Sequence, residues 1–261
     1  MAKIIAVSNQ KGGVGKTTTA VNLASTLAAA EKRTLLIDMD PQGNASSGVG
    51  YKSPEKEQNI YEVLLNLASI SDVIKKTSVH WLDLVPSNIR LIGAELEMIN
   101  LSDREHCLKR AICKLKEDYQ FIIIDSPPSL GLLTVNSLSA ANSVLIPIQC
   151  EYYALEGITQ LLKTVDLIKT YFNRNLRIEG ALLTMFDKRT NLSTQVAENI
   201  KVNFKDTVFK TIIPRNVSLG ESPSYGKPII SYDIKSKGAQ AYLNLAQEVI
   251  KNAEKGFGKG T

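Results

Sequence analysis

The stretch that decides the fold lies near the start of the chain and reads Lys3-Ile4-Ile5-Ala6-Val7-Ser8-Asn9-Gln10-Lys11-Gly12-Gly13-Val14-Gly15-Lys16-Thr17-Thr18-Thr19. An apolar run of strand type enters a glycine-rich turn, and the turn opens into a segment with apolar residues at helical spacing. A strand, a glycine-rich loop and a helix N-terminus together form a phosphate cradle, because backbone N–H groups and the helix dipole point at the anion.

We expect the cradle to be lined by Gly12, Gly13, Val14, Gly15, Lys16, Thr17 and Thr18. Lys16 would reach the β- and γ-phosphates, and the Thr17 hydroxyl would ligate Mg²⁺. The strict Walker A pattern fails, because Gln10 stands where that pattern has glycine, and a second lysine, Lys11, stands at the entrance of the loop. The alternative is a turn that only joins a strand to a helix.

The segment from Lys11 to Thr18 resembles the deviant Walker A box of the ParA/Soj/MinD ATPases. The resemblance implies ATP and Mg²⁺ as cofactors. It also implies a homodimer that encloses two nucleotides, in which Lys11 reaches the phosphates of the partner subunit. In that family Lys11 and Lys16 therefore both serve catalysis; the spacing alone does not show the dimer.

Composition favours a soluble α/β protein of one domain. The chain has 261 residues, of which 44% are hydrophobic and 22% charged. It contains no apolar stretch long enough for a transmembrane helix and leaves no room for a signal peptide before the first strand, so we expect a cytoplasmic protein. The odd number of cysteines predicts reduced thiols, and the only histidines, His80 and His106, do not suggest a zinc site.

The net charge of +5 is unevenly distributed along the chain. Residues 1–170 hold 17 basic and 18 acidic side chains, whereas residues 171–261 hold 14 and 8. The positive excess therefore lies in the C-terminal third. It is consistent either with a solvated basic surface or with a patch that binds a polyanion.

Strand and helix patterns alternate along the chain, which predicts a mostly parallel, twisted sheet of about seven or eight strands with helices on both faces. The predicted strands are Ile4–Val7, Thr34–Asp38, Leu82–Val85, Phe121–Asp125, Val144–Ile148, Glu179–Thr184 and Val208–Ile213. Apolar residues at helical spacing around 158–168 and 239–250 predict core-facing helices. We expect a surface loop at 51–59, a P-loop domain over 1–255 and a disordered tail at 256–261.

Acidic residues follow two of the predicted strands. Asp38 and Asp40 end the second strand, and Asp125 ends the apolar run Phe121-Ile122-Ile123-Ile124 in a Walker B arrangement. Ligands bind at the carboxyl ends of strands in such sheets, so these acids should face the phosphate loop, with Asp125 meeting Mg²⁺. By resemblance, Asp40 orients or activates the attacking water and Asp38 supports the metal site. Capping of a turn or helix is the alternative for Asp38 and Asp40.

Later segments extend the resemblance over nearly the whole chain, which is most similar to the short chromosomal ParA/Soj type. The family places the segment Pro214-Arg215-Asn216 against adenine, which implies Pro214 and Asn216 as base contacts. An ordinary strand-to-helix turn is the alternative.

The basic C-terminal third and the resemblance together suggest that an ATP-bound dimer binds double-stranded DNA without sequence specificity. The candidate contacts are Lys188, Arg189, Lys201, Lys205, Arg215, Lys227 and Lys235. Arg189 is favoured, because 187–191 resembles a family segment whose arginine touches DNA. Many relatives carry a further arginine at the position of Ser218, so that contact is in doubt. The resemblance also implies a ParB-type partner and association with the nucleoid.

Other function classes stay open at this point. A MinD-like membrane-cycling ATPase would need an amphipathic C-terminal helix, but the tail after Asn252 offers only Phe257 as a large apolar residue, so no stable membrane association is expected. An ATP-dependent electron-transfer protein would need paired cysteines at a dimer interface, and none are evident. A non-catalytic scaffold would not explain why Lys16, Asp40 and Asp125 all fall beside one loop.

Overall fold

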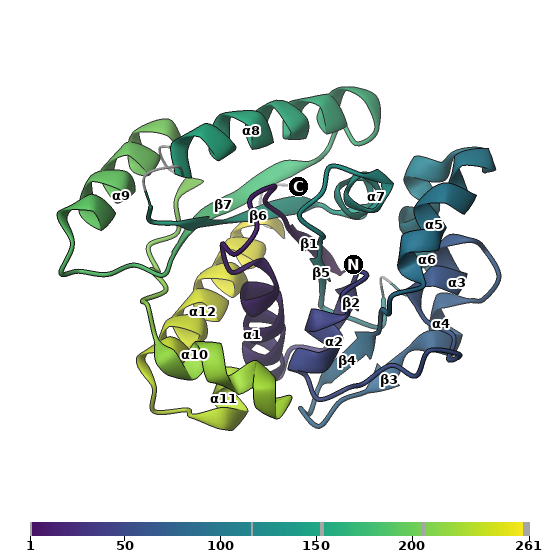
Figure 1. Cartoon of the computed structure of the whole chain (residues 1–261), viewed down its shortest axis with the longest axis horizontal. Helices are drawn as coiled ribbons and strands as arrows, with labels where there is room; N and C mark the ends of the chain where they lie inside the picture. The colour runs from purple at the N-terminus through teal and green to yellow at the C-terminus, as the bar shows by residue number, and fades with distance from the viewer. Residues whose placement is uncertain (1, 116, 152–153, 205–206, 258–261) are drawn as a thin grey trace.

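A seven-stranded sheet forms the centre of the molecule (Figure 1). The computed structural model describes residues 2–115, 117–151, 154–204 and 207–257. The strand order is β3-β4-β2-β5-β1-β6-β7, and all pairs are parallel except β3 with β4. The strands are β1 (Lys3–Val7), β2 (Thr34–Asp38), β3 (Lys75–Lys76), β4 (Leu82–Val85), β5 (Phe121–Asp125), β6 (Ser143–Gln149) and β7 (Arg177–Thr184).

Helices cover both faces of this sheet. Their bounds are α1 (Lys16–Ala29), α2 (Asn44–Gly48), α3 (Ile60–Leu64), α4 (Ile70–Val73), α5 (Leu91–Glu97), α6 (Cys107–Ile112), α7 (Leu132–Ala140), α8 (Ala154–Tyr171), α9 (Asn191–Phe204), α10 (Val217–Glu221), α11 (Ile229–Tyr232) and α12 (Lys237–Phe257). Short 3₁₀ turns lie at Met98–Asn100, Arg104–His106, Cys113–Leu115 and Ser222–Tyr225 (η5).

Alternate residues of the central strands enter two separate cores. In β1, Ile4 and Ala6 pack with helices α3 to α9, whereas Ile5 and Val7 pack with α1, α2 and α10 to α12. The same alternation runs through β2 and β5. Because every strand of the centre is buried on both faces, the sequence reads there as near-continuous apolar runs. The predicted α/β architecture is confirmed.

The last helix ties the C-terminal third to the helix that follows the phosphate loop. The hydroxyl of Tyr242 in α12 lies 3.2 Å from the Thr19 hydroxyl of α1, and both residues are buried. The backbone N–H of Ile229 in α11 donates to the Asn22 side chain of α1 at 2.7 Å. These contacts hold α1 in place against the C-terminal helices. The predicted helices at 158–168 and 239–250 are confirmed as α8 and α12.

One predicted strand is wrong in detail. Residues 208–213 run parallel to β7, where Phe209 N–H donates to Ala181 and Ile213 N–H to Leu183, but they form only isolated bridges. The Glu248 carboxylate of α12 accepts the N–H groups of Lys210 and Thr211 at 2.8 and 3.1 Å. A side chain thus takes a donor that a regular ladder would use.

Two further differences are an additional short strand and a longer last helix. The two-residue strand β3 carries only lysines, so no alternation in the sequence predicted it. Helix α12 continues to Phe257, so the start of the predicted disordered tail is helical, and the rest, 258–261, lies outside the described residues. The predicted loop at 51–59 is confirmed. Among the described residues no helix is both long and apolar enough to cross a membrane.

Candidate functional site

The loop between β1 and α1 has the backbone shape of a phosphate cradle. Gly13 and Gly15 have φ angles of +74° and +88°, which a residue with a Cβ rarely adopts. Space is not the constraint, because a Cβ added at Gly12 or Gly13 would meet no atom within 4 Å. The conformation of the backbone therefore explains the glycines at 13 and 15, and the surface of the loop at 12 and 13 is open.

Lys16 lies inside the loop rather than in solvent. Its residue is 7% exposed, and its Nζ donates a hydrogen bond to the Lys11 carbonyl oxygen at 3.0 Å. Burial lowers the pKa of Lys16, while the nearby carboxylates of Asp125 and Asp40 oppose that shift. The side chain is thus held as a buried cation at the concave side of the loop, where a bound phosphate would meet it.

Two anchors of the loop were missed by the sequence reasoning. The Asn9 side chain donates to the Pro147 carbonyl at 2.7 Å and accepts from the Lys11 N–H at 3.1 Å. The Thr184 hydroxyl donates to the Val14 carbonyl at 2.8 Å. Both anchors come from chain segments that end β1 and β7, and their positions at strand ends are the only sequence signal for them. They fix the shape of the loop.

Asp38 is occupied within its own loop. Its carboxylate accepts hydrogen bonds from the N–H and hydroxyl of Ser46, at 2.8 and 2.7 Å, and from the Asp40 N–H at 3.2 Å. Burial raises the pKa of Asp38 to about 6, against the hydrogen bonds from Ser46 and Asp40 that lower it. The side chain organises the turn from β2 into α2, so its predicted support of a metal would act through that turn.

Asp125 has the opposite surroundings. Both of its carboxylate oxygens are buried and accept no regular hydrogen bond from the described part of the chain. Burial and the neighbouring Asp38 carboxylate raise the pKa of Asp125 well above its usual range, and the nearby Thr17 hydroxyl and Lys16 ammonium only partly oppose this. A buried carboxylate without a partner is costly, and a hard cation with its bound water would satisfy it. The predicted pair of Asp125 and Thr17 therefore fits Mg²⁺.

Asp40 lies at the same edge, with an exposed fraction of 9%. One of its carboxylate oxygens accepts the Gln42 N–H at 2.9 Å, and its carbonyl accepts the Ser87 hydroxyl at 2.7 Å. Asp40 and Asp125 both lie near the buried ammonium of Lys16, and Asp38 lies beside Asp125. The structure thus brings together Lys16 and the predicted acids at the carboxyl ends of β2 and β5.

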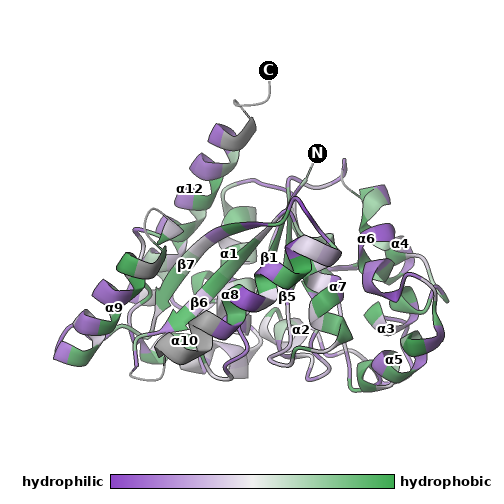
Figure 2. Ribbon diagram, turned by 90° about the horizontal axis from the view of Figure 1, so that it is seen from above, coloured by the Kyte–Doolittle hydropathy of each residue, from purple (hydrophilic) through white to green (hydrophobic). Residues whose placement is uncertain are grey.

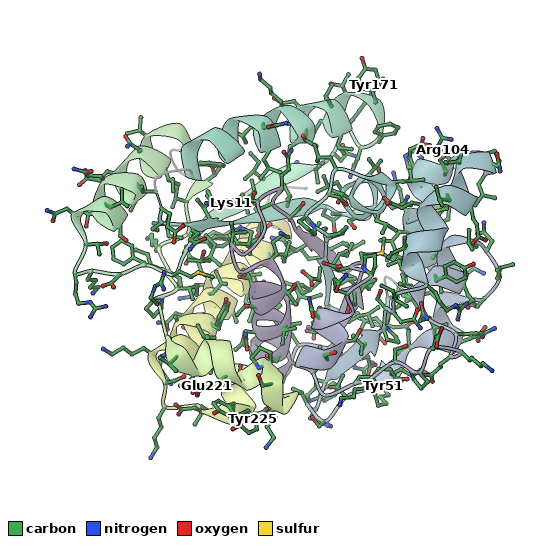
Figure 3. All side chains as sticks on the ribbon, in the orientation of Figure 1. Lys11, Tyr51, Arg104, Tyr171, Glu221 and Tyr225 are labelled. Carbon is green, nitrogen blue, oxygen red and sulfur yellow. The ribbon has the colours of Figure 1, made fainter. Side chains whose placement is uncertain are left out.

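The entrance of the loop carries the second lysine. Lys11 is partly exposed beside the open glycines, and Figure 3 shows it between α1 and α8. Gln10, which replaces the Walker A glycine, donates to the Thr164 hydroxyl of α8 at 3.0 Å. The departure from the strict motif therefore ties the loop to a neighbouring helix.

Pro214 and Asn216 lie beyond the end of β7. Pro214 forms an isolated bridge with Phe186, which is adjacent to Met185, whose side chain is 4.0 Å from a Cβ built on Gly15. Asn216 caps α10, since its side-chain oxygen accepts the Leu219 N–H at 3.2 Å. Asn216 thus has a structural role as the cap of α10, and its contact with a base stays a prediction.

The predicted DNA contacts that the structure describes differ in their surroundings. Arg189 is paired with Asp187 at 2.7 Å, and this pair holds the pKa of Asp187 well below its usual range. Arg215 lies near the same loop and 3.8 Å from Glu151. Lys227 lines a separate cavity of about 420 Å³ beside Thr17 and Thr18.

The other predicted DNA contacts are either exposed or not described by the structure. Lys188 and Lys235 are exposed. The Lys201 side chain and the whole of Lys205 lie outside the described residues. At the position where an arginine was in question, the Ser218 hydroxyl lies 3.4 Å from the Asp233 carboxylate.

The fold and this site define a P-loop nucleotide-binding protein. A family model described as an AAA domain matches residues 2–178. The chain is 58% identical to the sporulation initiation inhibitor protein Soj of Bacillus subtilis over 97% of this chain and 100% of that one. It is 57% identical to the chromosome partitioning protein ParA of Myxococcus xanthus, over 96% and 89%.

A solved structure gives the same result for the fold. Cobyrinic acid a,c-diamide synthase of Mycobacterium smegmatis, crystallised with an ATP analogue and magnesium, superposes with a TM-score of 0.87 at 36% identity and covers 98% of this chain and 97% of its own. The chain belongs to the ParA/Soj family of chromosome-partitioning ATPases.

Proposed function

We propose that this protein is a Mg²⁺-dependent ATPase that dimerises on ATP, binds double-stranded DNA in that state and acts in partitioning with a ParB-type partner at the nucleoid. The observation that carries the nucleotide part is the buried Asp125 carboxylate, which accepts no regular hydrogen bond in the described part of the chain and lies beside Lys16 and Thr17. Membership in the family supports the partitioning role.

The proposed roles follow from the positions of the side chains. Backbone N–H groups of the loop, Lys16 and Thr18 bind and orient the phosphates, and Thr17 with Asp125 holds Mg²⁺. The bound Mg²⁺ neutralises charge on the phosphates. Asp40 orients the attacking water, and Lys11 contributes its ammonium to the phosphates bound by the partner subunit. The open surface at Gly12 and Gly13 leaves room for the same lysine of the partner to reach the phosphates bound here.

Dimerisation is tested by light scattering on apo, ADP and non-hydrolysable ATP samples. We expect the mass to double only with the ATP analogue. Asp40→Ala should stay dimeric in ATP and release no phosphate, whereas Lys11→Ala should bind nucleotide as a monomer. One unchanged mass in all three nucleotide states would contradict the proposed dimer.

DNA binding is tested by a salt titration in ATP. Phosphate contacts predict that log affinity falls linearly with log salt, with a slope of about −0.9 per neutralised phosphate. A flat response, or equal binding in ADP, would contradict the proposal. Sedimentation with anionic vesicles is the matched arm, because ATP-dependent pelleting with vesicles and none with DNA would favour the MinD-like alternative.

The partner is tested by phosphate release with DNA and the N-terminal peptide of a ParB-type protein, alone and together. We expect weak basal hydrolysis that rises mainly when both are present. Full activity without either ligand would contradict the proposed regulation.

A further inference from the structure

A second concave site lies at the opposite end of the strands from the phosphate loop. The cavity has a volume of about 530 Å³ and is formed where β2, β4 and β5 begin, next to β3. Figure 2 shows this end of the sheet, where the N-terminus lies, pointing away from α2, α5 and α10. A cavity of this size is in the range of small-molecule sites.

The only tryptophan of the chain, Trp81, lines this cavity. Trp81 has a φ angle of +67°, a left-handed conformation that is strained for an aromatic residue. Its carbonyl accepts the Thr34 N–H at 2.9 Å, so the strained backbone is held by β2. The Trp81 residue is nevertheless 40% exposed. Strain held by the surrounding structure at an exposed aromatic side chain is a feature of binding sites.

A guanidinium group lies directly at this wall. The Arg33 guanidinium lies over the Trp81 ring, with its carbon 5.3 Å from the ring centre. The His80 ring, which also lines the cavity, contacts the same indole edge-on at a centroid distance of 4.9 Å. The Arg33 backbone is fixed, because its carbonyl accepts the N–H groups of Gln120 and Phe121 at 2.8 and 3.2 Å. In the described part of the chain no carboxylate pairs with Arg33. A positioned guanidinium without a counter-charge is a receptor for an oxyanion.

The negative charge nearby is largely compensated. Asp83 lies at the floor of the cavity, where its carboxylate pairs with Lys76 at 2.9 Å and accepts the Tyr119 hydroxyl at 2.8 Å. Asp118 stands at the rim and disfavours an anion on its side. The anionic end of a ligand therefore belongs at Arg33, beside the indole.

We propose that this cavity binds a small aromatic anion, with its planar ring against Trp81 and its carboxylate or phosphate group on Arg33. Ring stacking and a charge-assisted hydrogen bond together give the selectivity. Arg33 and Asp38 flank β2 at its two ends, so the cavity and the nucleotide site are separated by roughly 17 Å along one strand. The two sites can be filled at the same time.

The single tryptophan gives a direct test. Full-length protein saturated with ATP analogue and Mg²⁺ is titrated with 4-nitrobenzoate, whose nitro group quenches indole fluorescence on contact. The neutral analogue 4-nitrobenzamide is the matched control. We expect saturable quenching by the anion and at least about ten-fold weaker binding of the amide, because a hydrogen bond between charged groups is lost.

Two variants test the assigned residues. Arg33→Gln should reduce the affinity for 4-nitrobenzoate to that of the amide. It should still fold, because the Arg33 contacts to Gln120 and Phe121 are made by its backbone, and only the contact of its guanidinium with Trp81 is lost. Trp81→Gly accepts the left-handed φ without strain, so it should fold and show no binding heat in calorimetry. Linear quenching without saturation, equal affinity for acid and amide, or binding of 4-nitrobenzoate to nucleotide-free protein that is lost when the ATP analogue is added would each overturn the proposal.

Discussion

The phosphate loop and the basic C-terminal third both present cations, but they hold them differently. The Lys16 residue is 7% exposed and its ammonium is fixed on the Lys11 carbonyl. The Arg189 side chain is 85% exposed and pairs with Asp187 in its own loop. A buried cation has one geometry and acts on one ligand, whereas exposed cations act together through long-range charge. Single substitutions should therefore have large effects in the first region and small effects in the second.

The largest effect is expected at Lys16. Lys16→Ala should weaken ATP binding by at least about 100-fold, which corresponds to about 2.7 kcal/mol, because charge-assisted bonds to phosphate are lost in a water-poor site. Titration with a fluorescent ATP analogue measures this. Lys11→Ala is the control and should bind ATP nearly as well as the unmodified protein. Equal losses in both variants would show that burial of Lys16 is not what separates the two lysines.

The next effect distinguishes the two buried acids. Asp125→Asn removes a buried carboxylate without a partner, so the melting temperature without nucleotide should rise by about 2–4 °C for each kcal/mol gained. ATP binding should at the same time lose its dependence on Mg²⁺. Differential scanning calorimetry and Mg²⁺ titrations measure both.

Asp38→Asn is the matched control for Asp125→Asn. It puts an amide nitrogen against donors from Ser46 or Asp40, so it should destabilise the protein by about 1–3 kcal/mol. Stabilisation by both substitutions, or by neither, would contradict the different surroundings of the two acids.

A smaller effect is expected in the loop after β7. Arg189→Gln should weaken DNA binding about three- to ten-fold and reduce the slope of the salt dependence by about 1. Asp187→Asn should strengthen binding a few-fold, because it frees the Arg189 guanidinium from its local ion pair. Electrophoretic or fluorescence titrations at several salt concentrations measure both. If the double variant bound more tightly than Arg189→Gln alone, Asp187 would act independently of Arg189.

The smallest effect is expected at Ser218. Ser218→Arg adds a cation where many relatives carry one, but Asp233 lies 3.4 Å from the serine hydroxyl and would pair with the new guanidinium. We expect DNA affinity to rise about two-fold or less, and more when Asp233→Asn is added. A large gain from the single substitution would show that this position faces DNA directly.

Local motifs made most of the nucleotide site predictable. The strand, the glycines and Lys16 are contiguous, and the positive φ angles of Gly13 and Gly15 follow from the loop that these glycines build. Asp125 follows an apolar run that is typical of a buried strand, and parallel strands bring their carboxyl ends to one edge. These features depend on neighbours in sequence, so the sequence carries them.

The missed features depend on partners far along the chain. Glu248 lies in the last helix, yet it accepts the N–H groups of Lys210 and Thr211 in the segment that was predicted to be a strand. Thr184, at the end of the edge strand β7, donates its hydroxyl to the Val14 carbonyl of the phosphate loop. The Trp81 and Arg33 pair joins two loops that no motif connects.

The sequence by itself determined that this protein has a phosphate loop, a parallel sheet and acids at its edge, because these follow from periodicity and from short motifs. Only the tertiary structure decided which acid accepts regular hydrogen bonds and which has only the nearby Thr17 hydroxyl and Lys16 ammonium. Asp38 and Asp125 look equivalent as residues at strand ends, and they differ because Ser46 reaches only one of them. Hydrogen bonding within a buried site depends on positions in space, and the order of residues along the chain does not contain them.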